Sequence, residues 1–240
     1  MKTKCRFEQH VILLAVPVAL WMHARTGLAG TLLTVYLTAC VFITARLWSR
    51  WHAWRSAYID AIVTLALNVY SPAERMHAER VAELSAAIAK EMGFSIRKIT
   101  LIRVAGYLHD IGKHIKGDIV DDRWHVAKGA DLVSRLPILS ETADWIRHHH
   151  TWHNGVSCLA SLAMAKVPIE AAILAVAEHF DTATCGDAES AEFDDAVEDV
   201  RRRTGTQLHP AVVKAFLAVM LRQSAQNYSA TASCIRHQSI

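Results

Sequence analysis

Histidines and carboxylates of the kinds that bind metal ions recur at long intervals between residues 77 and 181. The pair His109-Asp110 lies in the hexapeptide LHDIGK (residues 108–113), at the end of an apolar segment. Adjacent side chains project at neighbouring angles around a helix, and Gly112 can loosen the turn, so both members of the pair can reach one ion. The other candidate ligands are His77, His125, His148, His149, His150, Glu178 and Asp181.

Several imidazoles with two carboxylates indicate a particular class of metal ion. Such a set suits Fe, Mn, Zn or Co, whereas Ca and Mg prefer mostly oxygen ligands. Two ions bridged by Asp110 would hold a hydroxide and clamp a phosphate group for in-line attack. Lys113 could then neutralise a non-bridging phosphate oxygen. These residues predict a metal-dependent phosphohydrolase in which Asp110 and Lys113 take part in catalysis.

Single members of the set also have simpler explanations. His77 taken alone would be interpreted as a partly exposed polar residue of a helix. The run His148–His150 could be a solvated helix end, where cations interact favourably with the helix dipole. His148 becomes a ligand if the register shifts by one. Glu178 and Asp181 lie one turn apart on the same helix face, so we favour Glu178 and keep Asp181 as its alternative.

The elements that must position these residues are predicted to be helices. After residue 55, apolar residues recur every three or four positions, and few segments alternate as strands do. Residues 71–74 (SPAE) form a capping box with proline at the first helical position, which predicts a helix to about Met92. Ser95 begins another helix that reaches about Ile111. Further helices are expected at about 123–135, 140–150, 168–181, 189–203 and 210–222, and the polar tail from Ser224 is expected to be loose.

Two apolar runs before these helices predict a membrane anchor. Val11–Met22 is uninterrupted, and Ala29–Trp48 reaches about 20 residues, enough to cross a bilayer. We predict transmembrane helices at about 9–27 and 29–48, joined by a turn in the segment HARTGLAG (residues 23–30). Basic residues precede the first run and follow the second, so the positive-inside rule places both termini in the cytoplasm.

Two alternatives to a hairpin anchor remain open at this point. The first run could be the apolar region of a cleaved signal peptide, with the second run acting as a stop-transfer segment. Both runs could instead be buried helices of a soluble protein.

Charge is unevenly distributed along the 240 residues. Hydrophobic residues make up 52% of the chain, which is high for a soluble protein. Residues 1–60 have a net charge of +5 and the remainder has a net charge of −2, so the larger part lacks the positive field of a protein that binds a nucleic-acid polymer. Five widely spaced cysteines without a C-x-x-C pair are predicted to be reduced thiols. Trp152 is interpreted as a packing residue rather than a platform on which a base stacks.

Four stretches carry a family resemblance that covers about residues 58–222. They are HAERVAELSAAIAKEMG (77–93), AGYLHDIGK (105–113), HVAKGADLV (125–133), and HHTWHNG (149–155) followed by VPIEAAILAVAEHFDTAT (167–184). They resemble the HD superfamily of metal-dependent phosphohydrolases, and within it the HD-GYP phosphodiesterases of cyclic di-GMP. The segment RTGTQLHPAVVKAFL (203–217) resembles the closing segment of that family.

The resemblance implies an all-α fold, a bundle of about five to seven helices with two divalent ions between them. It implies that one ion is bound by His77, His109, Asp110 and Glu178. It implies that the second is bound by Asp110, His125, His149 and His150, with Lys113 contacting phosphate. Fe or Mn is the expected metal, with Zn and Co as alternatives.

This sequence departs from the family pattern at several positions. The Gly-Tyr-Pro signature falls on Ser157-Cys158-Leu159, and the family's aspartate ligand falls on Glu178. A position that holds a glutamate ligand for a third ion in some members is Ala73 here, so two ions are expected. About a dozen residues are also missing between the HD motif and His125, where the family often has a loop over its substrate.

Together these features predict three parts: a membrane anchor at 1–55, an HD-GYP-like phosphohydrolase domain at 56–223 and a polar tail at 224–240. The expected activity is hydrolysis of cyclic di-GMP to linear pGpG or GMP through a metal-bridged hydroxide, at the cytoplasmic face of a bacterial inner membrane. The expected partners are a small nucleotide, the membrane and no nucleic-acid polymer, and a homodimer is left open. The alternatives are hydrolysis of another nucleotide, or a degenerate module that binds a nucleotide without catalysis.

Overall fold

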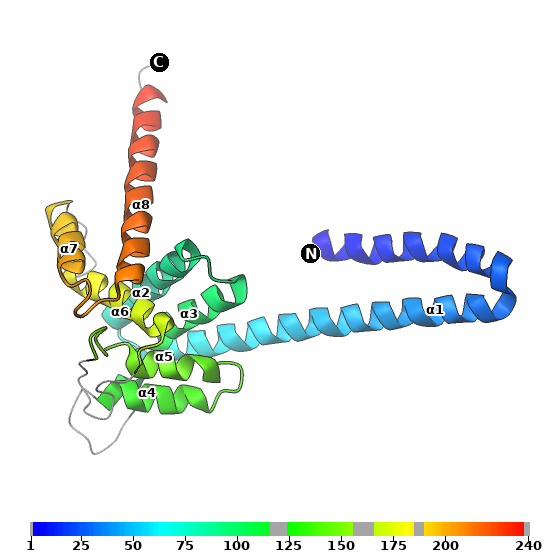
Figure 1. The fold of residues 1–240 in the computed structure, drawn as a ribbon, viewed down its shortest axis with the longest axis horizontal. Coiled ribbons are helices and arrows are strands. Elements are labelled where there is room, and N and C mark those ends of the chain that lie inside the picture. The colour runs from blue at the N-terminus through cyan, green and yellow to red at the C-terminus, as the bar shows by residue number, and fades with distance from the viewer. Residues whose placement is uncertain (1, 116–123, 156–165, 185–189, 238–240) are drawn as a thin grey trace. The chain divides into compact units, whose positions relative to one another are not determined.

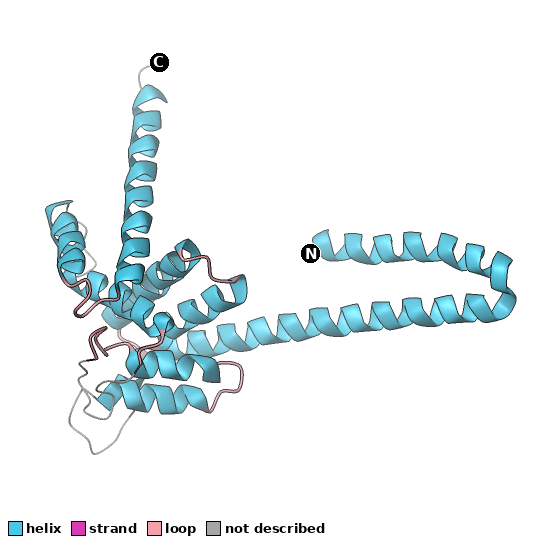
Figure 2. Ribbon diagram, viewed as in Figure 1, coloured by secondary structure: helices cyan, strands magenta, loops and turns pink. Residues whose placement is uncertain are grey.

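The computed structural model describes residues 2–115, 124–155, 166–184 and 190–237. Within these ranges the regular secondary structure is helical, and the β-type pairing is limited to an isolated bridge between Thr204 and Leu208 (Figure 2). The predicted all-α class is therefore confirmed. The chain divides into two compact units, Met1–Asp60 and Ala61–Ile240, which are described separately.

The first unit belongs to one long helical element, α1 (Lys2–Val69), which is broken at Gly27. Gly27 has φ 66° and ψ −151°, a conformation that side-chain-bearing residues rarely adopt. The chain reverses direction there (Figure 1), within the segment 23–30 that was expected to turn. The second arm continues to Val69, past residue 48, where the second transmembrane helix was expected to end, and past the expected end of the anchor at residue 55.

The arm Gly27–Val69 is long and apolar enough to cross a membrane, with a mean hydropathy of 1.9 over its most apolar window, of which 11% is buried. Threonine hydroxyls of this arm bond to carbonyls of the same helix. The hydroxyls of Thr34 and Thr38 donate to the carbonyls of Gly30 and Thr34, each at 2.8 Å. Such bonds leave no unpaired hydroxyl where water is absent.

The second unit is a helical bundle that carries the candidate ligands. Its α-helices are α2 (Pro72–Glu91), α3 (Ile96–Leu108), α4 (His125–Ser134), α5 (Ala143–His148), α6 (Ile169–Thr184), α7 (Ser190–Arg202) and α8 (Pro210–His237). Two short 3-10 turns, Ile111–His114 and Ser140–Thr142, lie between them. The capping box predicted at the start of α2 is formed, because Ser71 N donates to Glu74 Oε2 at 2.8 Å and the Ser71 hydroxyl accepts from Glu74 N.

Helices α2, α3 and α6 form the core of the bundle. Val81 and Ile88 of α2, Leu101 of α3 and Ile173 of α6 are all fully buried. A Cβ atom at Gly106 would lie 2.5 Å from the Ala82 Cα, so glycine is required for α2 and α3 to approach this closely. This approach places the start of α2 beside the end of α3, where the HD motif begins.

Three expected boundaries differ from the structure. The helix expected to reach Ile111 ends at Leu108, and the helix expected at 140–150 consists of a 3-10 turn followed by α5, which ends at His148. The prediction of a loose tail from Ser224 is wrong, because α8 continues to His237. Residues 224–237 contain neither glycine nor proline, so nothing stops the helix once it has been nucleated.

Candidate metal centre

His109 and Asp110 lie in the turn that follows α3, at the centre of the candidate site. His109 is the C-cap of α3, and Asp110 has φ −98° and ψ 2°, so the two side chains leave the helix axis at this point. Gly112 makes the turn compatible with α4, because a Cβ atom there would collide with the carbonyl oxygen of His125. The early end of α3 and this glycine let the HD turn lie against the first residue of α4.

Six predicted ligands converge around the seventh, Asp110. Ligand-capable atoms lie within 4.8 Å of one another in three overlapping groups. The groups are His77, His109 and Glu178; His125, His149 and His150; and His109, Asp110 and His149. Each of the first two groups contains three of the four residues in one ligand set that the family resemblance implied, and the third group contains Asp110, which belongs to both sets.

Asp110 connects the groups through both of its oxygens. Its Oδ1 lies 3.3 Å from His125 Nε2, and its Oδ2 lies 3.5 Å from His109 Nε2 and 3.9 Å from His77 Nε2. Lys113 Nζ donates to Oδ2 at 2.7 Å. A carboxylate in this position has one oxygen directed at each histidine group.

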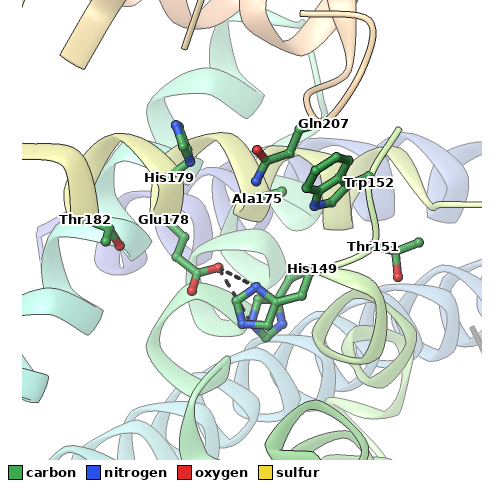
Figure 3. Close-up of a pocket in the computed structure, with 9 residues that line it drawn as sticks. His149, Thr151, Trp152, Ala175, Glu178, His179, Thr182 and Gln207 are labelled. Atoms are coloured by element: carbon green, nitrogen blue, oxygen red, sulfur yellow. Dashed lines mark ion pairs between the residues drawn. The ribbon is translucent and has the colours of Figure 1, made fainter. Parts of the chain in front are cut away.

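Glu178 and Asp181, the two alternatives on α6, occupy different environments. Glu178 Oε2 lies 3.6 Å from both His149 Nε2 and His150 Nδ1 (Figure 3). Asp181 accepts from Arg80 at 2.5 and 3.0 Å and lies 2.7 Å from His77 Nδ1. Asp181 therefore orients His77 from behind, while Glu178 faces the interior of the site.

Two buried histidines are oriented by their own backbone. His109 Nδ1 donates to Gly106 O at 2.7 Å, and His149 Nδ1 donates to Ile146 O at 2.6 Å. Each bond assigns the proton to Nδ1 and leaves the Nε2 lone pair directed into the site. Metal-binding histidines are held in this way by a partner on the second ring nitrogen.

Burial sets the charge states of the site. It lowers the pKa of His109, lowers the pKa of His149 strongly and lowers the pKa of His150 to about 4, so these rings are neutral at pH 7. Burial, with a smaller contribution from Asp110, raises the pKa of Glu178 to about 8. Burial would also raise the pKa of Asp110, but its electrostatic interactions with His109 and Lys113 outweigh burial and hold that pKa below its usual range.

The donor set fits divalent metal ions. His149 Nε2 and Asp110 Oδ1 are buried atoms that make no hydrogen bond to the residues that the structure describes, and a buried polar atom without a hydrogen bond costs about 1–3 kcal/mol. Neutral imidazoles and carboxylates are the ligands that Fe, Mn, Zn and Co accept. Bound cations would satisfy the unpaired atoms and favour the ionised form of Glu178.

Some predicted features lie elsewhere. His148 belongs to none of the three ligand groups of the described residues, whereas His149 and His150 belong to them. Ser157-Cys158-Leu159 lies outside the described residues. Arg80 was not anticipated as a site residue, although its position three residues after His77 puts both on one face of α2.

A cavity of about 230 Å³ opens beside the candidate ligands (Figure 3). His149, His150 and Glu178 line one part of it, and Trp152 and Gln207 line another. Trp152, interpreted from the sequence as a packing residue, is 38% exposed and lines this cavity.

Comparison with known proteins assigns the part of the chain that carries these ligands to a protein family. Residues 75–183, which include every candidate ligand from His77 to Asp181, match the family model described as the HD domain. This part of the chain is an HD domain. The predicted recognition of the superfamily is confirmed, and the HD domain contains all three ligand groups described above.

Proteins similar in sequence to this chain include phosphodiesterases of cyclic dinucleotides and ribonucleases. A cyclic di-GMP phosphodiesterase of Thermotoga maritima is 32% identical over 158 residues, which cover 59% of this chain and 43% of the relative. A 3′3′-cGAMP-specific phosphodiesterase of Vibrio cholerae is 25% identical over 142 residues, which cover 52% of this chain and 33% of the relative. Ribonuclease Y of Deinococcus radiodurans is 36% identical over 103 residues, which cover 43% of this chain and 17% of the relative. The chain thus spans less than half the length of these relatives.

Two solved structures resemble the fold of this chain at low sequence identity. A cyclic GMP-AMP specific phosphodiesterase of V. cholerae has a TM-score of 0.53 at 15% identity, covering 66% of this chain and 47% of that one. The PgpH HD domain of L. monocytogenes, in complex with cyclic-di-AMP, has a TM-score of 0.51 at 16% identity, covering 69% and 96%. At these identities the likeness supports the helical fold.

Proposed function

We propose that this chain is a membrane-anchored, metal-dependent phosphodiesterase of the HD-GYP-like type that hydrolyses cyclic di-GMP to linear pGpG and GMP. The observation that carries the proposal is the convergence of His77, His109, His125, His149, His150 and Glu178 around Asp110. A degenerate module has no need of seven metal-competent groups in one place. The 32% identity to a cyclic di-GMP phosphodiesterase favours this substrate.

The proposed site holds two divalent ions, Fe or Mn, with Zn or Co as alternatives. One would be bound by His77, His109, Asp110 and Glu178, and the other by Asp110, His125, His149 and His150. Such ions supply Lewis acidity and generate a nucleophile from water near neutral pH. The structure supports this set because the two unpaired atoms, His149 Nε2 and Asp110 Oδ1, belong to it.

The residues of the chain have separate tasks in this mechanism. The Nδ1 bonds of His109 and His149 hold both rings as the tautomer with a lone pair on Nε2. Lys113 lies 2.7 Å from Asp110 Oδ2 and its side chain is 34% exposed, so it is placed to contact a non-bridging phosphate oxygen from the open side. This contact neutralises charge that accumulates on phosphate as the 3′-oxygen leaves.

We place the membrane anchor at residues 1–55, the catalytic domain at 56–223 and a polar C-terminal segment at 224–240. The apolar arm of α1 and the basic residues at both ends of the predicted hairpin support an inner-membrane location with the catalytic domain in the cytoplasm.

The test uses the full chain in detergent, purified without oxygen and supplied with Fe(II) or Mn(II). Products of cyclic di-GMP are separated by chromatography, with cyclic di-AMP, 3′3′-cGAMP and single-stranded RNA as competing substrates. The Asp110→Asn variant should lose at least about a hundredfold in turnover and lose bound metal. The matched control Asp131→Asn alters an exposed carboxylate that pairs with Arg147 and should retain both.

Two results decide between the alternatives. Faster hydrolysis of another substrate in this panel would replace cyclic di-GMP while retaining the phosphodiesterase assignment. Absence of metal and of turnover in the parent chain would reject the enzyme altogether.

A further inference from the structure

We propose that Trp152 and Gln207 form a nucleobase subsite that selects a 6-oxopurine, such as guanine, over adenine. The inference deepens the proposed function and rests on it, because it assigns the part of the substrate that lies beyond the phosphate. The two residues line the same cavity as His149, His150 and Glu178. Figure 3 shows them next to each other on a wall away from Glu178.

Backbone hydrogen bonds join the two segments that carry these side chains. His153 N donates to Gln207 O at 2.9 Å, and Asn154 N donates to Thr206 O at 3.0 Å. Trp152 O accepts from Gly155 N at 3.0 Å, which closes the turn that carries the indole. The segments on both sides of the subsite are therefore tied to each other before any ligand binds.

The orientation of the Gln207 amide is determined by Arg203. Arg203 Nη1 donates to Gln207 Oε1 at 3.0 Å, and a guanidinium can only donate, so the oxygen of the amide faces Arg203. Arg203 is in turn held by Asp199, whose Oδ2 lies 2.7 Å from both Arg203 Nε and His179 Nε2. The group that Gln207 retains for a ligand is its NH₂, a donor.

A fixed donor beside an aromatic ring has a definite preference among bases. Every base has a face that can stack on the 38% exposed indole of Trp152, so stacking alone does not discriminate. The O6 and N7 atoms of guanine are both acceptors, whereas adenine presents an amino donor at N6 next to N7. The Gln207 NH₂ can therefore donate to either O6 or N7 of the first base, whereas on the second base it can donate only to N7 and meets the amino donor at N6.

The test compares binding of inosine monophosphate and adenosine monophosphate, whose bases differ in the C6 group and the N1 proton. Affinities are measured by calorimetry on the full Mn(II)-loaded chain in detergent. The parent should prefer inosine monophosphate by about tenfold, as expected for one correct against one mismatched polar contact. Gln207→Glu keeps the acceptor for Arg203 but presents a second acceptor to the base, so the ratio should fall to one or below.

Trp152 is tested by a pair of variants. Trp152→Ala should weaken both nucleotides about tenfold without changing their ratio, and Trp152→Phe should retain most of the affinity. Equal ratios in the parent and Gln207→Glu, or no binding by the parent, would overturn the subsite. Hydrolysis of cyclic di-GMP and of bis(p-nitrophenyl) phosphate by the same proteins reports the proposed function separately, since the second substrate contains no base.

Discussion

Asp110 lies where two histidine groups meet, and the roles of its neighbours follow from their distances to it. His109 and His125 are directed at its two oxygens, and Lys113 neutralises it from the open side. The two carboxylates of α6, Glu178 and Asp181, have different contacts. Glu178 faces the imidazoles of His149 and His150, whereas Asp181 is engaged by Arg80 and His77.

This division predicts different effects of two amide substitutions on α6. Glu178→Gln removes a proposed ligand and should abolish one of two bound ions. Asp181→Asn leaves all proposed ligands and should weaken metal affinity about 10- to 100-fold, as expected when the partner of a ligating histidine is lost. Metal content after dialysis against graded chelator measures both. If Asp181→Asn lost an ion that Glu178→Gln retained, the two assignments would be exchanged.

Metal affinity should rise with pH between about 6 and 8. Without metal, the raised pKa of about 8 keeps Glu178 mostly protonated at pH 7, so an ion must displace that proton. Affinity should increase by at most about tenfold per pH unit from this group and level off above pH 8. Burial lowers the pKa values of His109, His149 and His150, which reduces the slope that these rings contribute in this window.

The same shift has an opposite effect on the metal-free fold. The folded-state pKa of Glu178 is raised, so its contribution to stability is present below about pH 4.5 and is lost as pH rises towards 8. A Glu178→Gln variant should show a flatter dependence of both metal affinity and metal-free stability on pH. An unchanged slope in this variant would show that another group releases the proton.

At the scale of elements, the site depends on where helices end and on how closely they approach. The end of α3 at Leu108 frees His109 and Asp110 from the helix, and Gly112 admits the His125 carbonyl of α4. Gly106 performs the equivalent task between α3 and α2, against Ala82. The two groups of ligands meet around this turn, because α2, α4 and α6 and the residues that follow α5 also bring their ligands to it.

Gly112→Ala should therefore damage both stability and metal binding. A methyl group at this position collides with backbone, which cannot move as a side chain end can, and overpacking of this kind costs about 1–3 kcal/mol. Ser71→Ala removes only the α2 cap and should cost about 1 kcal/mol with metal content unchanged. Chemical denaturation and metal analysis separate the two; equal metal content in both variants would contradict the close approach.

At the scale of the whole molecule, the HD domain occupies the second unit, and the first unit is dominated by an apolar helical arm. The arm Gly27–Val69 exposes large apolar side chains, among them Leu33 and Leu37, each 53% exposed. Hydrophobic burial of this surface requires a bilayer or another apolar partner. The threonine hydroxyls that bond to the carbonyls of the same helix suit the former.

The full chain expressed in bacteria should sediment with membranes and resist extraction by high salt and by alkaline carbonate. Detergent should release it, because the attachment is apolar rather than electrostatic. Recovery in the soluble fraction at physiological salt would reject the anchor. Release by salt alone would show a peripheral attachment through the basic residues of 1–60.

The sequence by itself determined the helical class, the capped start of α2 and the identity of the ligand-capable residues, because these depend on local periodicity and side-chain chemistry. It favoured Glu178 but kept Asp181 as an alternative, because the two share a helix face and only the tertiary structure shows that Arg80 and His77 engage Asp181. It also missed the continuation of α8 and the position of Trp152 in the cavity wall. Those features depend on which residues far apart in the chain come into contact, and only the tertiary structure decides that.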